Sequence, residues 1–164
     1  MVEIYDSKCI LFSKNKGEVK FLYDNLSISD GLRLMNEHGF TAMPVINKDG
    51  IYKGNISEGD FLWYLLNHSS ITAEDLETIK IKELIRKDYM PAVRIDVDLK
   101  TLVERSLEQN YVPIVDDRGI FIGIVTRKSI IKYLMNHTMN EAIPYDSEWS
   151  TTFDARPSNL TYMH

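Results

Sequence analysis

The stretch MPVINKDGIYKGNISEGDFLWYLL (residues 43–66) recurs 69 positions later as VPIVDDRGIFIGIVTRKSIIKYLM (residues 112–135), and the two copies align without a gap. Proline, glycine and tyrosine stand at matching places in both, as in the pair Pro44 and Pro113. A repeat at a fixed spacing indicates one supersecondary unit that is used twice. The sequence therefore predicts two structurally equivalent halves.

The repeated stretch predicts a hairpin followed by a helix. In the second copy, the apolar runs VPIVD (residues 112–116) and IFIGIV (residues 120–125) have the composition of strands. Gly119, between them, can supply the positive φ that a tight hairpin turn needs. The apolar runs FLWYLL and IIKYLM, which follow in the first and second copy, then predict a helix.

The segments before each hairpin predict one more strand and one more helix. Residues 30–39, DGLRLMNEHG, and residues 98–110, DLKTLVERSLEQN, place apolar residues at helical spacing. We expect the preceding strands in EVKFLY (residues 18–23) and PAVRI (residues 91–95). Between the copies, HSSITAEDLETIK (residues 68–80) begins with helix-capping residues and predicts a short linking helix.

These patterns divide the chain into five segments. They are an N-terminal extension at 1–14, a first unit at 15–68, a linker helix at 69–80, a second unit at 81–138 and an irregular C-terminal tail at 139–164. The tail is polar and shows no sustained periodicity. Its aromatic residues Trp149, Phe153 and Tyr162 could anchor it on a surface.

Composition excludes several classes of function. A formal net charge of −5 argues against a broad nucleic-acid interface, which needs a concentrated basic face. No apolar run approaches the roughly 20 residues of a membrane span, and the acidic start lacks a signal peptide. The single cysteine, Cys9, and four widely spaced histidines indicate neither a disulfide nor a metal site. We expect a soluble, cytoplasmic protein.

The two helices that follow the hairpins begin differently. In the first copy, Ser57 precedes Glu58 and Asp60, and an acid three residues after a capping serine can reach back to it. Both acids also suit the positive end of the helix dipole. An ordinary, self-sufficient cap explains this start.

The second copy has Thr126 at the cap, followed by Arg127 and Lys128, with Ser129 in the place of Asp60. We expect no acid here to satisfy the free N–H groups, and the two cations strengthen the positive end of the helix. A phosphate held by Thr126, backbone N–H groups and Arg127 would restore the balance. Alternatively, the cations point into water or pair with the turn acids Asp116 or Asp117.

The repeated order of a Pro-Val-type strand, an acidic turn, glycine and a Ser/Thr-capped helix resembles the CBS domain, and two in tandem resemble a CBS pair, or Bateman module. The resemblance covers residues 15–138. The chain is also similar to small stand-alone bacterial CBS-pair proteins. It implies an α+β fold of two β-α-β-β-α units packed about a pseudo-twofold axis, with two clefts between them. It also implies a homodimer and a regulatory adenine-containing ligand such as AMP, ADP, ATP, S-adenosylmethionine or cyclic di-AMP.

The resemblance assigns ligand-binding residues to each cleft. The first cleft is assigned Val19, Lys20, Phe40, Thr41, Ala42, Thr126, Arg127 and Ser129. The second, less favoured cleft is assigned Ser57, Asp60, Val93, Asn110, Tyr111 and Val112, with Ala92 beside Val93.

Both clefts depart from the family pattern. Asp60 stands at the position of the family's ribose-binding carboxylate, whereas the first cleft has Ser129 there. Glu58 would repel a phosphate from the second cleft. The first cleft therefore suits cyclic di-AMP, which has two phosphates and no free 2′,3′-diol in either ribose.

Three functions follow from this reading. The favoured one is a regulatory module that senses an adenine nucleotide and signals to a partner protein. The alternative is a ligand-free interaction scaffold that keeps the fold. Catalysis is the least favoured, because the sequence has no nucleophile elbow, P-loop or HExxH motif. We therefore expect no enzyme, no cofactor beyond the regulatory nucleotide, and no bound metal.

Overall fold

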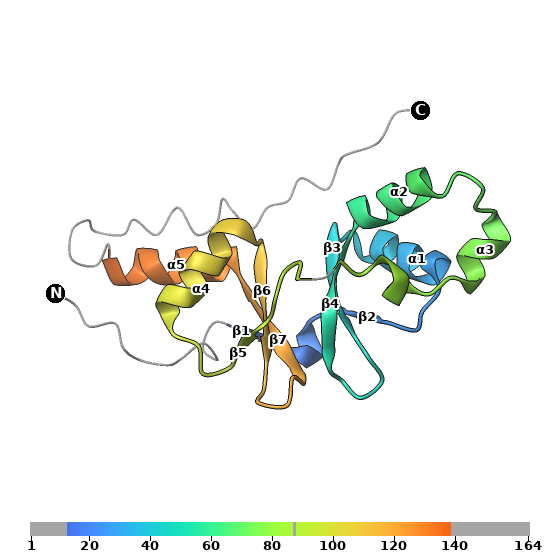
Figure 1. Cartoon of the computed structure of the whole chain (residues 1–164). Coiled ribbons are helices and arrows are strands. Elements are labelled where there is room, and N and C mark those ends of the chain that lie inside the picture. The colour runs from blue at the N-terminus through green and yellow to red at the C-terminus, as the bar shows by residue number, and fades with distance from the viewer. Residues whose placement is uncertain (1–12, 87, 139–164) are drawn as a thin grey trace, which may run out of the picture. The chain divides into compact units, whose positions relative to one another are not determined.

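A computed structural model of the protein describes residues 13–86 and 88–138, and the predictions for Cys9 and for the tail lie outside the described residues. Each repeat has the predicted order of strand, helix, strand, strand, helix. In the first repeat these elements are β2 (Leu22–Tyr23), α1 (Ile28–His38), β3 (Ala42–Ile46), β4 (Tyr52–Ser57) and α2 (Glu58–Asn67). In the second they are β5 (Val93–Arg94), α4 (Leu99–Glu108), β6 (Tyr111–Val115), β7 (Phe121–Thr126) and α5 (Arg127–Thr138) (Figure 1).

Each repeat builds its own sheet, with order β2-β3-β4 in the first and β1-β7-β6-β5 in the second. In both hairpins the turn glycine has a positive φ, 82° at Gly50 and 79° at Gly119, as the turn prediction requires. The strands predicted before each helix are confirmed but have only two residues each.

The edge strand β1 (Ser13–Asn15) was not predicted. It precedes the first repeat in the chain but pairs antiparallel with β7 of the second repeat, with Asn15 opposite Gly123. A Cβ at Gly123 would overlap the backbone carbonyl oxygen of Lys14, so only glycine admits this close crossing. The 3-10 turn η2 (Lys16–Glu18) then leads the chain from this sheet to the first repeat.

The linker between the repeats folds back on the first repeat. Helix α3 (Ala73–Thr78) is shorter than the predicted helix, and the 3-10 turn η3 (Ile81–Leu84) follows it. Around them, the Ile28 N–H donates to the Ile79 carbonyl and the Ile81 N–H donates to the Leu26 carbonyl. The buried Ile81 side chain joins the core beneath α1.

Strand alternation divides the side chains of β3 between two environments. Met43 and Val45 are buried in the core that α1 and α2 cover, together with Phe61. Ile46, which faces the opposite side of the sheet, packs with Val19 and with Phe121 of the second repeat. The second face of the sheet therefore meets the other repeat.

Reciprocal contacts join the two hairpins. The Tyr52 N–H donates to the Gly119 carbonyl at 3.1 Å, and the Phe121 N–H donates to the Gly50 carbonyl at 2.9 Å. The rings of Tyr52 and Phe121 stack at 6.1 Å between centroids. Because Gly50 and Gly119, and likewise Tyr52 and Phe121, are equivalent positions, this exchange shows the predicted pseudo-twofold relation.

The described part of the chain up to Ile130 forms one compact unit that contains these contacts, and the rest of α5 belongs to a second unit. No described helix is long and apolar enough to cross a membrane.

Candidate functional site

The start of α5 satisfies part of its own hydrogen-bonding demand. The Thr126 hydroxyl oxygen accepts a hydrogen bond from the Ser129 N–H at 3.1 Å, and the Ser129 hydroxyl donates to the Thr126 carbonyl at 2.7 Å. Thr126 is thus a working N-cap without an acid. The expectation that no acid is present in the first turn is confirmed, and hydroxyl groups take the place of the carboxylate.

Arg127 turns toward the C-terminal end of α4. Its Nε donates to the Ser106 carbonyl at 2.6 Å, and its Nη2 donates to the Leu107 carbonyl at 3.3 Å. The last carbonyls of a helix have no intrahelical partner and carry partial negative charge, so a guanidinium there is stabilising. A tertiary neighbour therefore explains one of the two unusual cations.

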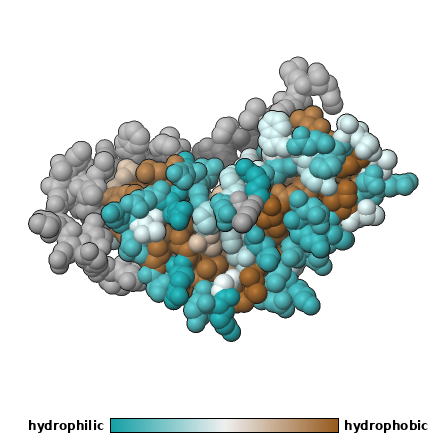
Figure 2. Space-filling model, viewed as in Figure 1, coloured by the Kyte–Doolittle hydropathy of each residue, from teal (hydrophilic) through white to brown (hydrophobic). Residues whose placement is uncertain are grey.

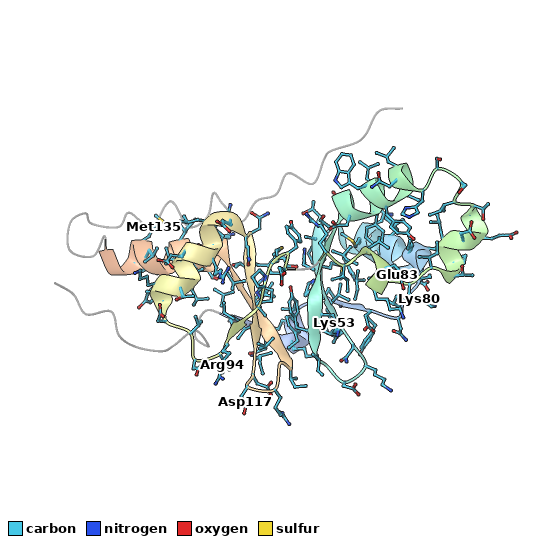
Figure 3. All side chains as sticks on the ribbon, viewed as in Figure 1. Lys53, Lys80, Glu83, Arg94, Asp117 and Met135 are labelled. Carbon is cyan, nitrogen blue, oxygen red and sulfur yellow. The ribbon has the colours of Figure 1, made fainter. Side chains whose placement is uncertain are left out.

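The alternative pairing of Arg127 with the turn acids is wrong. Asp116 accepts hydrogen bonds from Arg118 and is paired with it at 3.1 Å. Figure 3 shows Asp117 at the turn between β6 and β7, the opposite end of β7 from the start of α5. The guanidinium has five N–H donors, of which these carbonyls use two, so three remain available for an anion.

Val19 connects the two repeats at the first candidate site, which comprises Val19, Lys20, Phe40, Thr41, Ala42, Thr126, Arg127 and Ser129. Its buried side chain belongs to a hydrophobic cluster with Ile46 of β3 and Phe121 of β7, and Phe21, Tyr52 and Ile124 pack against this cluster. Ile124 lies two residues before Thr126. The structure thereby brings the segment of Val19 and Lys20 beside β7.

In the described part of the chain, the start of β3 has no strand partner on the side away from β4. The Thr41 carbonyl accepts from the Glu58 N–H at 3.0 Å, and Ala42 lies opposite Ser57. Because antiparallel pairs alternate between bonded and non-bonded, the N–H and carbonyl of Ala42 point away from β4. On that side, β2 pairs only with Val45 and Ile46. The Ala42 backbone can therefore hydrogen-bond a planar ligand edge.

The remaining first-site residues lie at the surface. Phe40 is 41% exposed, and Thr41 and Lys20 are also exposed. The hydrogen bonds shown for Thr126, Arg127 and Ser129 stay within the second repeat, and that of Thr41 stays within the first. Val19 belongs to a hydrophobic cluster that contains residues of both repeats.

The second candidate site, which comprises Ser57, Asp60, Val93, Asn110, Tyr111 and Val112, contains a carboxylate that already has partners. Asp60 Oδ2 accepts from the Ser57 N–H at 2.8 Å and from its hydroxyl at 2.6 Å, so the predicted cap is confirmed. Asp60 Oδ1 lies 2.6 Å from Arg86 Nε, and the Asp60 side chain is 4% exposed. The guanidinium of Arg86 also lies over the Tyr89 ring, 3.4 Å from its centroid.

Tyr111 crosses from the second repeat to the first. Its hydroxyl donates to Asn55 Oδ1 of β4, and burial raises the pKa of Tyr111 well above its usual value. Tyr52 is arranged similarly, because its hydroxyl donates to the Met90 carbonyl at 2.9 Å and burial raises its pKa. Both phenols therefore stay protonated hydrogen-bond donors.

Two residues assigned to the second site have buried side chains. Val112 alternates with Tyr111 along β6, so its side chain points to the opposite face and is fully buried. Val93 pairs with Ile114 in the sheet and is 9% exposed. A ligand at the second site could therefore meet the backbone of Val112 rather than its side chain, and the assignment of these two residues stays a prediction.

The sequence matches the CBS domain over residues 15–67 and 81–136. The chain belongs to the CBS domain family. Two CBS repeats in tandem, joined by the reciprocal hairpin contacts, make it a CBS pair with an α+β fold.

Individual proteins resemble the chain over most of its length. The uncharacterized protein MJ1426 of Methanocaldococcus jannaschii is 28% identical, over 70% of this chain and 84% of that protein. Cyclic di-AMP receptor B of Bacillus subtilis is 23% identical, over 68% of this chain and 75% of the receptor. A crystal structure of CbpB in complex with c-di-AMP superposes with a TM-score of 0.74 at 23% identity, covering 82% of this chain and 90% of that one. The curated enzymes that match share only 19–21% of their own length with the chain.

Sequence reasoning missed three residues of the CBS repeats that shape the second site: Arg86, Tyr89 and Asn55. Asn55 could have been found, because a polar side chain stands where the other copy has Ile124. Arg86 lies 26 positions from Asp60, and no local pattern links them.

Proposed function

We propose that this CBS pair is a regulatory module that binds an adenine nucleotide, cyclic di-AMP or AMP, ADP or ATP, at the first candidate site. The observation that carries the proposal is the start of α5, where Arg127 and Lys128 stand in a first turn without an acid. Three donors of Arg127 remain for an anion at this helix end. The receptor and the CbpB complex named above support the ligand class.

Each first-site residue has a chemical role in this proposal. The Ala42 backbone groups hydrogen-bond the adenine edge, while Val19 and Phe40 pack against the ring. Thr126, Ser129 and Arg127 bind phosphate, and Lys20 adds positive charge. Charge-assisted hydrogen bonds of Arg to phosphate are the strongest contacts in this set.

Ser129 favours a cyclic dinucleotide over a mononucleotide. A ribose with a free 2′,3′-diol is best held by a carboxylate that accepts from both hydroxyls, and serine offers one hydroxyl oxygen. Cyclic di-AMP has its 3′-oxygens esterified and presents two phosphates. The first site therefore suits a ligand that is rich in phosphate and lacks a diol.

Arg127 gives the ligand a route to the rest of the molecule. A phosphate bound by the remaining donors would share the guanidinium with the Ser106 and Leu107 carbonyls. Binding would therefore change the position of Arg127 at the C-terminal end of α4. A partner protein that distinguishes the two states of α4 would read ligand occupancy as a population shift.

Helix α2 offers a surface for a homodimer. Leu62, Trp63 and Leu66 are 51%, 60% and 62% exposed, and Figure 2 shows hydrophobic surface over this helix. Exposed aromatic and aliphatic side chains on one element are typical of an association surface. The proposal places a second copy of the chain here and an as yet unidentified partner protein elsewhere.

The second candidate function is a ligand-free interaction scaffold. It is favoured by Arg127, whose guanidinium already has protein partners, and by Asp60, whose carboxylate does too. In a scaffold, both groups would serve only to hold the fold together.

A thermal-shift titration separates the two functions. Purified protein is titrated with cyclic di-AMP, AMP, ADP, ATP and cyclic di-GMP, beside Arg127→Ala and the matched control Arg118→Ala, whose ion pair is at the surface. Ligand at about 100 times its dissociation constant adds about 2.7 kcal/mol of apparent stability. A shift that one adenine nucleotide gives to the wild type and control but not to Arg127→Ala supports sensing, whereas no shift with any ligand supports the scaffold.

A further inference from the structure

The two candidate sites of the CBS pair differ in their charged residues. Leu22 pairs with Val45 and Val93 pairs with Ile114, so Leu22 and Val93 occupy equivalent places. Counting back seven residues from each, Arg86 is equivalent to Asn15. The other member of the ion pair, Asp60, is equivalent to Ser129. The Arg86–Asp60 pair therefore has no counterpart at the first site.

Asp60 has little capacity left for a ligand. Its Oδ1 accepts from Arg86 Nε, and its Oδ2 accepts from both donors of Ser57 and, at 3.4 Å, from Arg86 Nη2. A ribose diol would need to donate to these same oxygens. Because the side chain is almost fully buried, it cannot turn outward to meet a ligand, so the guanidinium must leave first.

Arg86 is placed so that it can leave. Its side chain is 49% exposed, and its guanidinium also lies over the Tyr89 ring. An unpaired buried carboxylate is costly, so the pair opens only when other donors replace the guanidinium. The two hydroxyls of a ribose are donors of the right number.

Side-chain volume also differs between the two sites. Tyr111 stands where the first site has Ala42, and its hydroxyl is bonded to Asn55, which stands where the first site has Ile124. The phenol thus reaches Asn55 of the first repeat, whereas alanine at the first site has no side chain that could do so.

From this asymmetry we infer that Arg86 acts as a built-in substitute for ligand, which keeps the second site closed to ribose and limits the CBS pair to one nucleotide per chain. The inference rests on the proposed function for the first site. It adds that the second site is a latent diol site, specific for a nucleoside with free 2′ and 3′ hydroxyls. Its occupancy is set by the fraction of molecules in which the Arg86–Asp60 pair is open.

The test uses adenosine, which has the diol and no phosphate for Glu58 to repel. Equilibrium dialysis measures adenosine uptake in the presence of saturating cyclic di-AMP, for the wild type, Arg86→Ala, Arg86→Gln and Arg33→Ala. Arg33 is the matched control because it pairs with Asp30 at the surface of α1. Circular dichroism of each variant shows whether it is folded.

We expect no adenosine uptake by the wild type and Arg33→Ala, and one adenosine per chain for Arg86→Ala. Uptake should be lost with 2′,3′-dideoxyadenosine and in the double variant Arg86→Ala, Asp60→Ala. If Arg86→Ala fails to fold, Arg86→Gln is used in its place. Because glutamine keeps an amide donor for Asp60, we expect a smaller gain in adenosine uptake.

Adenosine uptake by the wild type equal to that of the Arg86 variant would overturn the inference, as would a folded Arg86 variant that takes up none. Two cyclic di-AMP molecules per wild-type chain would also overturn it. If cyclic di-AMP binds nowhere but Arg86→Ala gains diol-dependent uptake, the proposed function fails while the closed second site stands.

Discussion

Replacing Arg127 with alanine should destabilise the protein even without any ligand. The substitution removes the donors to the Ser106 and Leu107 carbonyls, of which the first, at 2.6 Å, is a short charge-assisted bond. A single hydrogen bond to a charged group contributes about 1.5–3 kcal/mol, and a cation at a helix C-terminus up to about 2 kcal/mol. Because Arg127 is half-buried and water can replace part of the loss, we expect the free energy of unfolding to fall by about 1–2 kcal/mol.

Urea denaturation measures this change. With a slope of about 2 kcal/mol per molar urea, the midpoint should move down by about 0.5–1 M. Arg118→Ala is the matched control, since its exposed pair with Asp116 contributes about 0–1 kcal/mol. Arg127→Lys should recover part of the loss, because an ammonium restores the charge but not the two-carbonyl geometry. A midpoint for Arg127→Ala equal to that of Arg118→Ala would refute the stabilising role of Arg127 at the C-terminal end of α4.

Three further predictions concern the fold. Gly123→Ala should lower the free energy of unfolding by about 1–3 kcal/mol in urea denaturation, because the new methyl overlaps the Lys14 carbonyl. Gly17→Ala, with open space around it, should be nearly neutral. Equal effects of the two substitutions would contradict the close crossing of β1. The pKa of Asp98 is lowered by the Thr101 N–H, so its contribution is present above the unfolded-state pKa and lost as the pH falls through the lower folded-state pKa. Asp98→Asn, which keeps a cap without a charge, should therefore flatten the fall of the urea midpoint below about pH 4, and an unchanged pH profile would count against this cap. Tyr111→Phe should cost about 1–3 kcal/mol of unfolding free energy by leaving the buried Asn55 side chain without its partner, and a thermal melt identical to wild type would show that water takes the place of the phenol.

The fold could be read from the sequence because its signals are local and occur twice. Hairpin glycines, apolar alternation and helix caps each lie within a few residues of one another, and the two copies confirm each other. The Ser57 cap closed by Asp60 is of this kind. Strand β1 escaped prediction because SKN at residues 13–15 has no strand pattern, and only its distant partner β7 makes it a strand.

The candidate site was less predictable, because its chemistry depends on tertiary neighbours. The charge at the start of α5 was visible, but its nearest acceptors come from the end of α4, 20 and 21 residues away in the chain. Arg86 likewise reaches Asp60 only because η3 and the following loop run beside β4, where Ile85 lies against Gly54. The pattern of a helix start shows which groups need partners, but it does not say which part of the chain supplies them.

Isothermal titration calorimetry of cyclic di-AMP into wild type, Arg127→Ala and Asp60→Ala tests the central proposal most directly. We predict that Arg127→Ala loses about 1.5–3 kcal/mol of binding free energy, a roughly 10- to 150-fold weaker dissociation constant, while Asp60→Ala binds almost as the wild type does. The opposite ranking, with full affinity in Arg127→Ala and a large loss in Asp60→Ala, would show that the ligand occupies the second site and would contradict the account.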